Sequence, residues 1–128
     1  MGLKITTPRI RKGVSRTKVI DNPDGATNVV RIGKKVSNWA VGITIAPRER
    51  PTHGITIDSF IEAGWESLHI FAEPDVVINE KHSHFPITKR KYRLGAWKNW
   101  FTALKNLVDL YPDADCYGII QDDVIFCK

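Results

Sequence analysis

Two adjacent carboxylates, Asp122 and Asp123, follow the apolar stretch 116–121 near the C-terminus. Neighbouring carboxylates repel each other, and this favours either a shared proton or a cation beside them. A hard divalent cation such as Mg²⁺ or Mn²⁺ binds one or two carboxylates and completes its shell with phosphate oxygens and water. The pair therefore indicates a metal site, and the alternative is two solvated aspartates in the turn after a strand.

Polar residues also follow two earlier apolar stretches. The loop 47–51, with the sequence PRERP, follows the first, and Glu73 and Asp75 follow the second. In open parallel sheets, ligands bind in the crevice beyond the carboxyl ends of the strands. We therefore expect the loop, Glu73, Asp75 and the aspartate pair to lie along one edge of a sheet.

The stretches that carry these residues alternate between strand and helix patterns. Residues 38–47 and 68–73 are mostly apolar, which is the pattern of strands covered on both faces. Between them, residues 52–64 show helical spacing of apolar residues, with Thr52 available as the N-cap and Gly64 as the C-terminal stop. A strand, a helix and a strand in this order form a parallel pair with a right-handed crossover.

The C-terminal half continues the alternation. We expect a short strand near 85–88 within the loop-rich segment 75–94, a helix over 95–110, and a last buried strand over 116–121. The predicted fold class is α/β, a three-layer α/β/α sandwich with a mainly parallel sheet, as in half of a Rossmann-like domain. The apolar residues of the 95–110 helix share one face, which we expect to be buried: Trp97, Trp100, Phe101, Leu104, Leu107 and Val108.

Histidines and a basic run offer further candidate sites. His82 and His84 are two residues apart, so in a strand their side chains would face the same way and could bind a metal ion together. No third ligand is evident nearby, which favours a solvated loop instead. The basic run 88–93 is either a solvated loop or a loop that faces phosphates. The four tryptophans could stack on sugars or bases, but their places in strand and helix patterns favour core packing: Trp39, Trp65, Trp97 and Trp100.

Basic residues concentrate at the N-terminus. Residues 1–35 carry nine Lys or Arg against two Asp, a net charge of +7, whereas the remainder carries ten basic and twelve acidic residues. We therefore divide the chain into a basic extension, residues 1–37, and an α/β domain, residues 38–128. Turn-forming residues at 22–25 make the extension either a mobile arm or a short pair of strands.

The basic extension indicates a possible second function, a non-catalytic interaction module. Clustered Lys and Arg bind nucleic acid or another polyanion through phosphate contacts, and such binding weakens steeply with salt. The extension has no aromatic residue for base stacking, so nucleic acid is the less favoured partner.

The sequence also carries information on the compartment. No stretch approaches the roughly 20 apolar residues of a membrane span, and the N-terminus lacks the apolar centre of a signal peptide. We therefore expect a cytoplasmic protein in which Cys116 and Cys127 are reduced thiols.

Several motifs in order resemble the N-terminal half of a GT-A glycosyltransferase of the family 2 type. They are WAVGITIAPRERPT, a helix ending in AGW, a strand ending in FAEP, LGAWKNWFTAL and YGIIQDDVIF, and they span the chain from Asn38 to its C-terminus. QDDV is similar to the D-x-D region of that family in its x-D-D form. A Walker B strand would also end in an aspartate, but no G-x-x-x-x-G-K-[ST] loop is present, which disfavours a P-loop nucleotidase.

The resemblance implies a site for a nucleotide-sugar and its divalent cation, Mn²⁺ or Mg²⁺. Asp123 would hold the metal that bridges the two phosphates, and Asp122 would contact the metal, ribose or sugar. Arg48 would lie near the base or phosphate, and Glu73, in preference to Asp75, would contact uracil or ribose. The full set implied for the nucleotide is Ala46, Pro47, Arg48, Arg50, Glu73, Asp75, Arg93, Gly95, Lys98, Asn99 and Asp122.

Further expectations concern the activity and the assembly of the chain. A full transferase continues beyond its metal-binding aspartates into an acceptor-binding half with the general base, so we expect donor binding, of a UDP-sugar by the commonest case, rather than transfer. Lys98 stands where the family often has an arginine, which leaves its role open. A sheet that ends on the strand 116–121 exposes an unpaired edge, for which we expect a homodimer or a strand-exchanged form.

Overall fold

The structure, a computed structural model, describes residues 16–21, 27–32 and 36–127. The chain divides into two compact units, Met1–Val36 and Ser37–Lys128. Among the described residues, no helix is long and apolar enough to cross a membrane.

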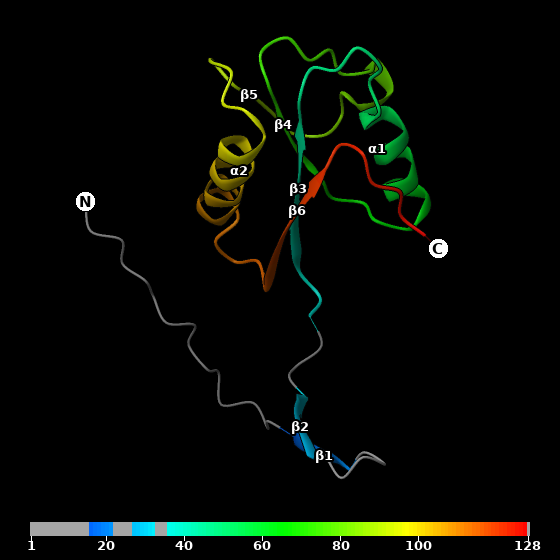
Figure 1. The fold of residues 1–128 in the computed structure, drawn as a ribbon, viewed down its shortest axis with the longest axis vertical. Coiled ribbons are helices and arrows are strands. Elements are labelled where there is room, and N and C mark those ends of the chain that lie inside the picture. The colour runs from blue at the N-terminus through cyan, green and yellow to red at the C-terminus, as the bar shows by residue number, and fades with distance from the viewer. Residues whose placement is uncertain (1–15, 22–26, 33–35, 128) are drawn as a thin grey trace, which may run out of the picture. The chain divides into compact units, whose positions relative to one another are not determined.

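The first unit contains a pair of antiparallel strands (Figure 1). Strand β1 (Arg16–Asp21) pairs with β2 (Thr27–Ile32), with Arg16 opposite Ile32 and Asp21 opposite Thr27. A short pair of strands is one of the two structures that the sequence predicts here, and it is the one present. The predicted turn at 22–25 lies outside the described residues.

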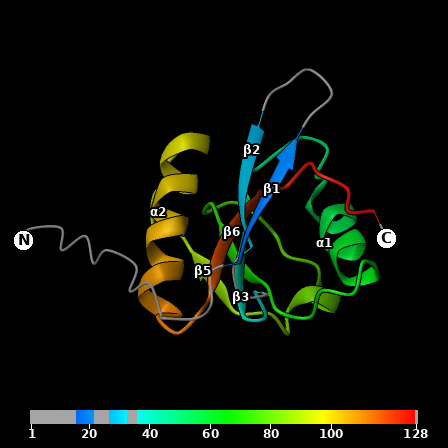
Figure 2. The same cartoon turned by 90° about the horizontal axis from the view of Figure 1, so that it is seen from below.

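The second unit is built on a four-stranded sheet of order β5-β4-β3-β6, in which every pair of neighbours is parallel. Helices α1 and α2 lie on opposite faces of this sheet (Figure 2). The predicted α/β class with a parallel sheet is therefore confirmed. The elements are β3 (Trp39–Ile45), α1 (His53–Glu62), β4 (His69–Ala72), the short 3₁₀ helix η1 (Glu80–His82), β5 (Ile87–Lys89), α2 (Ala96–Leu110) and β6 (Cys116–Gln121).

Alternate residues of the central strands supply two separate cores. The larger core, between the sheet and α1, joins Ile43 and Ile45 of β3 to Ile57 and Phe60 of α1, all fully buried. The smaller core lies on the α2 side and contains Ala40, Phe71, Ala103 and Leu107. Because the sheet is covered on both faces, β3 and β4 are apolar along nearly their whole length.

Helix α2 turns a different face to the sheet from the one predicted. Its buried residues are Asn99, Ala103 and Leu107, whereas Trp97 is 75% exposed and Phe101 is 58% exposed. The Asn99 amide donates a hydrogen bond to the Phe71 carbonyl oxygen at 3.4 Å, and this contact holds the side of α2 that carries Asn99 against β4. The prediction of a buried apolar face is therefore confirmed for Leu107 and wrong for Trp97, Phe101 and Val108, while Trp100 and Leu104 are half-buried.

The tryptophans also depart from the predicted core packing. Trp97 stacks on Trp100, with ring centroids 5.5 Å apart, on the outer side of α2. Trp39 is 40% exposed and meets Trp65 edge to face at 5.8 Å. Core packing is confirmed only for Trp65, which is half-buried and stacks on Phe60 at 5.5 Å.

Element ends follow the predicted signals with two differences. Gly64 ends α1 in the left-handed region, with φ of 90°, and its N–H donates to the Ile61 carbonyl oxygen at 2.9 Å. Thr52 occupies the N-cap position, but its hydroxyl makes no capping bond to the helix. Strand β6 is half-buried rather than buried, because within the described residues it pairs with β3 alone.

Candidate functional site

The carboxyl ends of β3, β4 and β6 meet at one edge of the sheet around a cavity of about 70 Å³. The first turn of α2 opens onto the same cavity through Ala96. Of the polar residues predicted to meet at this edge, Arg48, Glu73 and Asp122 line the cavity. The polar side chains that line the cavity are Thr44, Arg48, Glu73, Asn99, Gln121 and Asp122.

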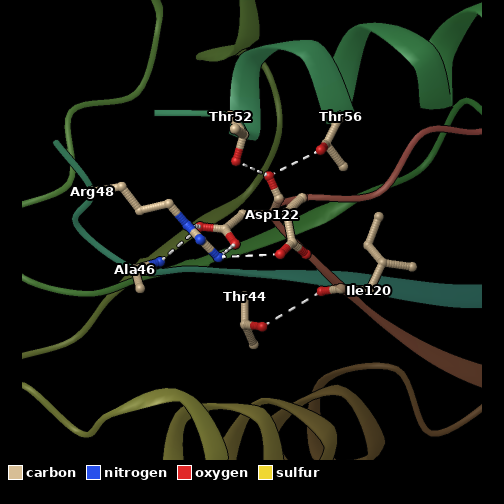
Figure 3. A network of polar contacts seen from close by, with 8 residues as sticks. Thr44, Ala46, Arg48, Thr52, Thr56, Ile120 and Asp122 are labelled. Atoms are coloured by element: carbon tan, nitrogen blue, oxygen red, sulfur yellow. Dashed lines mark hydrogen bonds and ion pairs between the residues drawn. The ribbon is translucent and has the colours of Figure 1, made fainter. Parts of the chain in front are cut away.

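Asp122 is the buried carboxylate of this edge, with 3% of its surface exposed. Arg48 donates to both of its oxygens, from Nη2 to Oδ1 at 2.6 Å and from Nε to Oδ2 at 3.2 Å (Figure 3). The backbone N–H of Ala46 donates to Oδ2 at 3.2 Å. The hydrogen bond and the charge of Asp122 raise the pKa of Arg48 above its ordinary value. The carboxylate thus accepts three hydrogen bonds, two from the guanidinium and one from a backbone amide.

The backbone of Asp122 is held by helix α1. Its carbonyl oxygen accepts hydrogen bonds from the hydroxyls of Thr52 at 2.6 Å and Thr56 at 3.0 Å (Figure 3). This explains why Thr52 does not cap its own helix. The two threonines were not predicted as site residues; the only sequence signal is their spacing of four residues at a helix start, which puts both hydroxyls on one side.

Asp123 differs from its neighbour in exposure. Its side chain is 45% exposed, and its Oδ2 lies 3.5 Å from Arg48 Nη2. The described residues contain no group of three or more His, Cys, Asp or Glu that could hold a metal ion. An ion at this edge would therefore have two carboxylates at most. Mg²⁺ fits such a site when phosphate oxygens and water complete its coordination shell. In this structure the positive charge beside both aspartates is the guanidinium of Arg48.

Comparisons of this chain with models of protein families, with curated proteins and with solved structures find no match. The function of the site has to be inferred from its own chemistry. That chemistry combines a buried carboxylate, an exposed carboxylate, a guanidinium and the start of a helix. Carboxylates attract cations, while a guanidinium and a helix N-terminus attract anions, so the edge is suited to a ligand with both.

The two acidic residues after β4 have different environments. Glu73 is 1% exposed, and its carboxylate accepts hydrogen bonds from the backbone N–H of Leu94 at 2.9 Å and of Gly95 at 3.0 Å. It therefore fixes the chain where α2 begins, and Gly95 there has φ of 79°. Asp75 is exposed and lines a second cavity of about 140 Å³ with Pro47, Arg48 and His53 among its other walls.

Arg90 is a further residue of this edge that sequence reasoning missed. Its Nε donates to Asn99 Oδ1 at 2.8 Å, its Nη1 donates to Asn106 Oδ1 at 2.7 Å, and its guanidinium lies 5.2 Å from the centre of the Phe71 ring. Burial lowers the pKa of Arg90, and the charge of Glu73 opposes that shift. Within the basic run 88–93 this one arginine turns inward, and no local pattern distinguishes it from its solvated neighbours.

Other predicted residues lie outside the two cavities. Arg50, Arg93 and Lys98 are exposed and line neither of them. The prediction of a solvated loop is correct for His84 and wrong for His82, which is 1% exposed with its Nε2 2.8 Å from Asp58 Oδ1. Hydrogen bonds from Lys81 and His82 lower the pKa of Asp58.

Proposed function

We propose that the second unit binds a nucleotide-sugar through a divalent cation, as the donor-binding part of a glycosyltransferase. The observation that carries the proposal is the pairing of Asp122 and Asp123 at the carboxyl end of β6, beside Arg48 and the first turn of α2. The order of motifs that resembles GT-A enzymes supports the same assignment. A UDP-sugar is the proposed ligand, with Mn²⁺ or Mg²⁺ as the cation.

Each polar group has a proposed role. Asp123, with its exposed carboxylate, binds the cation, and Asp122 completes the protein's share of the coordination. The bound cation neutralises charge on the diphosphate as a Lewis acid. Asp75 is the better candidate than Glu73 for the nucleoside, since the Glu73 carboxylate already accepts backbone N–H groups.

Cationic residues complete the proposed site. Lys98 and Arg93 are exposed on α2 and in the preceding loop, outside both cavities, and we propose that they assist at the phosphates of a bound ligand that extends beyond them. Asn99 lines the cavity at the strand ends, where its Oδ1 accepts from Arg90 and its amide donates to the Phe71 carbonyl oxygen. Donor binding is the function proposed for this chain, and no described residue is assigned as a general base for transfer.

Calorimetric titration of UDP tests the proposal directly. UDP should bind saturably in the presence of Mn²⁺ and lose its binding when EDTA replaces the metal, and a parallel titration of GDP reports the base preference. Asp123→Ala should abolish the metal-dependent binding, because one of the two ligands is removed. It should leave the thermal unfolding temperature nearly unchanged, because it also relieves the repulsion between neighbouring carboxylates.

Asp113→Ala is the matched control, since Asp113 is also exposed but lies in the loop before β6, at the opposite end of that strand. It should bind UDP and Mn²⁺ as the unmodified protein does. Unchanged UDP affinity in Asp123→Ala would remove the metal site from the proposal. Binding of UDP that persists in EDTA would remove the cation altogether.

A second candidate function rests on the net charge of +7 in residues 1–35. By this alternative the chain is an interaction module whose basic extension binds a polyanion. Salt separates the two functions, because binding through phosphate contacts collapses within a few hundred millimolar NaCl, as counterion release requires. Metal-bridged nucleotide binding should instead collapse with EDTA.

A further inference from the structure

We infer that the site binds the cation and the diphosphate together, because Arg48 occupies the cation's position beside Asp122 until it pairs with a phosphate instead. The inference rests on the proposed function. It assigns Arg48 two successive partners, Asp122 in the free protein and a phosphate in the complex.

The free protein shows the first of these partners. The guanidinium of Arg48 binds both oxygens of Asp122, at 2.6 and 3.2 Å, and its Nη2 also lies 3.5 Å from Asp123 Oδ2. The two carboxylates that would ligate a cation therefore already share a positive charge. The guanidinium reduces the local charge from −2 to −1 and occupies the oxygens of Asp122, so it weakens the attraction for a divalent ion that enters alone.

The diphosphate alone meets the converse difficulty. It approaches one guanidinium and two carboxylates, whose charges sum to −1, so the local charge opposes a free anion. A cation and a diphosphate that enter together relieve both difficulties. The cation satisfies the carboxylates, and two phosphate oxygens offer the planar guanidinium of Arg48 a two-point partner in place of the one it leaves.

The surroundings of the pair indicate which member moves. Asp122 is anchored, with its side chain 4% exposed, its Oδ2 bonded to the Ala46 N–H and its carbonyl oxygen bonded to Thr52 and Thr56. The side chain of Arg48 is 42% exposed and has no described partner besides the two aspartates. Arg48 also lines both the cavity at the strand ends and the second cavity beside Asp75. Arg48 is therefore the member of the pair that changes partner, while Asp122 stays in place.

The exchange has a thermodynamic consequence. Mn²⁺ and UDP should each raise the affinity for the other, by a factor in the range of about 5–150 that is usual for coupled sites. The coupling should depend on Arg48, because the cation displaces its guanidinium from Asp122 and a phosphate of UDP then pairs with it.

Arg48→Met provides a test in which two affinities move in opposite directions. Without the guanidinium, Mn²⁺ alone should bind about fivefold or more tightly than it does to the unmodified protein, measured from the free-Mn²⁺ signal in electron paramagnetic resonance. UDP in saturating Mn²⁺ should bind more weakly, measured by calorimetry. Lys105→Met, which removes one exposed positive charge on α2, should change neither affinity.

Arg48→Lys is the second variant, since lysine keeps the charge but lacks the two-point fork. It should fall between the unmodified protein and Arg48→Met in both affinities, and it carries the test if Arg48→Met fails to fold. Equal Mn²⁺ affinity with and without Arg48, while UDP still requires Mn²⁺, would overturn the exchange and leave the proposed function standing. Additive binding of Mn²⁺ and UDP to the unmodified protein would also overturn it. Absence of any UDP binding in all variants would instead overturn the proposed function itself.

Discussion

At the scale of single residues, His69 at the start of β4 is a titratable group enclosed by the fold. It is 7% exposed, its Nδ1 lies 2.8 Å from the Tyr111 hydroxyl, and its Nε2 lies 2.7 Å from the Thr88 hydroxyl. Its ring also stacks on Phe71, with centroids 4.4 Å apart. Burial, and to a smaller degree the charge of Arg90, lower the pKa of His69 below its ordinary value of 6.5.

This lowered pKa predicts that the second unit loses stability in mild acid. Below pH 6.5 the unfolded chain binds a proton at His69 that the folded protein resists, so the free energy of unfolding falls as the pH decreases from 6.5 toward the folded pKa. The slope from one such group is at most about 1.4 kcal/mol per pH unit. Urea unfolding followed by tryptophan fluorescence between about pH 7.5 and pH 5 measures it, since all four tryptophans lie in this unit.

His69→Gln should flatten that pH dependence, whatever its effect on stability at neutral pH. His84→Gln, at an exposed histidine, should leave the slope as it is. Asp58 does not interfere, because its lowered pKa makes its contribution fall only as the pH drops through and below its ordinary value of 3.8. The same slope in His69→Gln and in the unmodified protein would show that another group is responsible.

At the scale of elements, the packing of α2 on the sheet depends on a glycine of β3. A Cβ added at Gly42 would lie 2.8 Å from Phe71 Cε2, 3.0 Å from Ile119 Cδ1 and 3.1 Å from Leu107 Cδ1. These side chains come from β4, β6 and α2, so one missing methyl group lets three elements meet. Close packing of this kind tolerates little added volume.

Gly42→Ala should therefore lower the free energy of unfolding of the second unit by about 1–3 kcal/mol, the usual cost of overpacking a core. Urea unfolding followed by tryptophan fluorescence measures the change. Gly118→Ala on β6 is the matched control, because a Cβ there meets nothing within 4 Å. It should be neutral or slightly stabilising, through the reduced entropy of the unfolded chain. An equal loss of stability in both variants would show that the close contacts at Gly42 are not the cause.

At the scale of the whole molecule, the basic charge and the candidate site belong to different units. The site residues all lie within Ser37–Lys128, whereas the residues that give the net charge of +7 precede Val36. Deletion of residues 1–36 should therefore leave Mn²⁺-dependent UDP binding unchanged in calorimetry. The full chain should bind a labelled polyanion at about 50 mM NaCl and release it by about 300 mM, and the deletion variant should not bind it at either concentration.

A loss of UDP binding on deletion would instead make the basic extension part of the nucleotide site. Salt-independent binding of the polyanion would exclude the phosphate contacts on which the alternative function rests. The expected homodimer through β6 stays a prediction, in which the partner strand would pair along the side of β6 that faces away from β3.

The helices and strands, and the edge of the sheet at which they meet, can be predicted from the order of residues. The strand predicted over 116–121 coincides with β6, and the parallel arrangement follows from strands that alternate with helices. Because parallel strands share one carboxyl edge, the positions of Arg48, Glu73 and Asp122 around one cavity were also predictable. These features depend on local periodicity and on the direction of the chain, and both can be read from the order of residues.

Only the tertiary structure decided which groups are paired and which are open. Arg48 and Asp122 are 74 residues apart, and no local pattern indicates that they neutralise each other while Asp123 stays exposed. Periodicity likewise shows that α2 has an apolar face, but the Asn99 contact with β4 turns another face to the sheet. The physical reason is the same in each case. Pairing and burial depend on competition among groups that the fold brings together from distant positions in the chain, and local sequence patterns carry no information on those contacts.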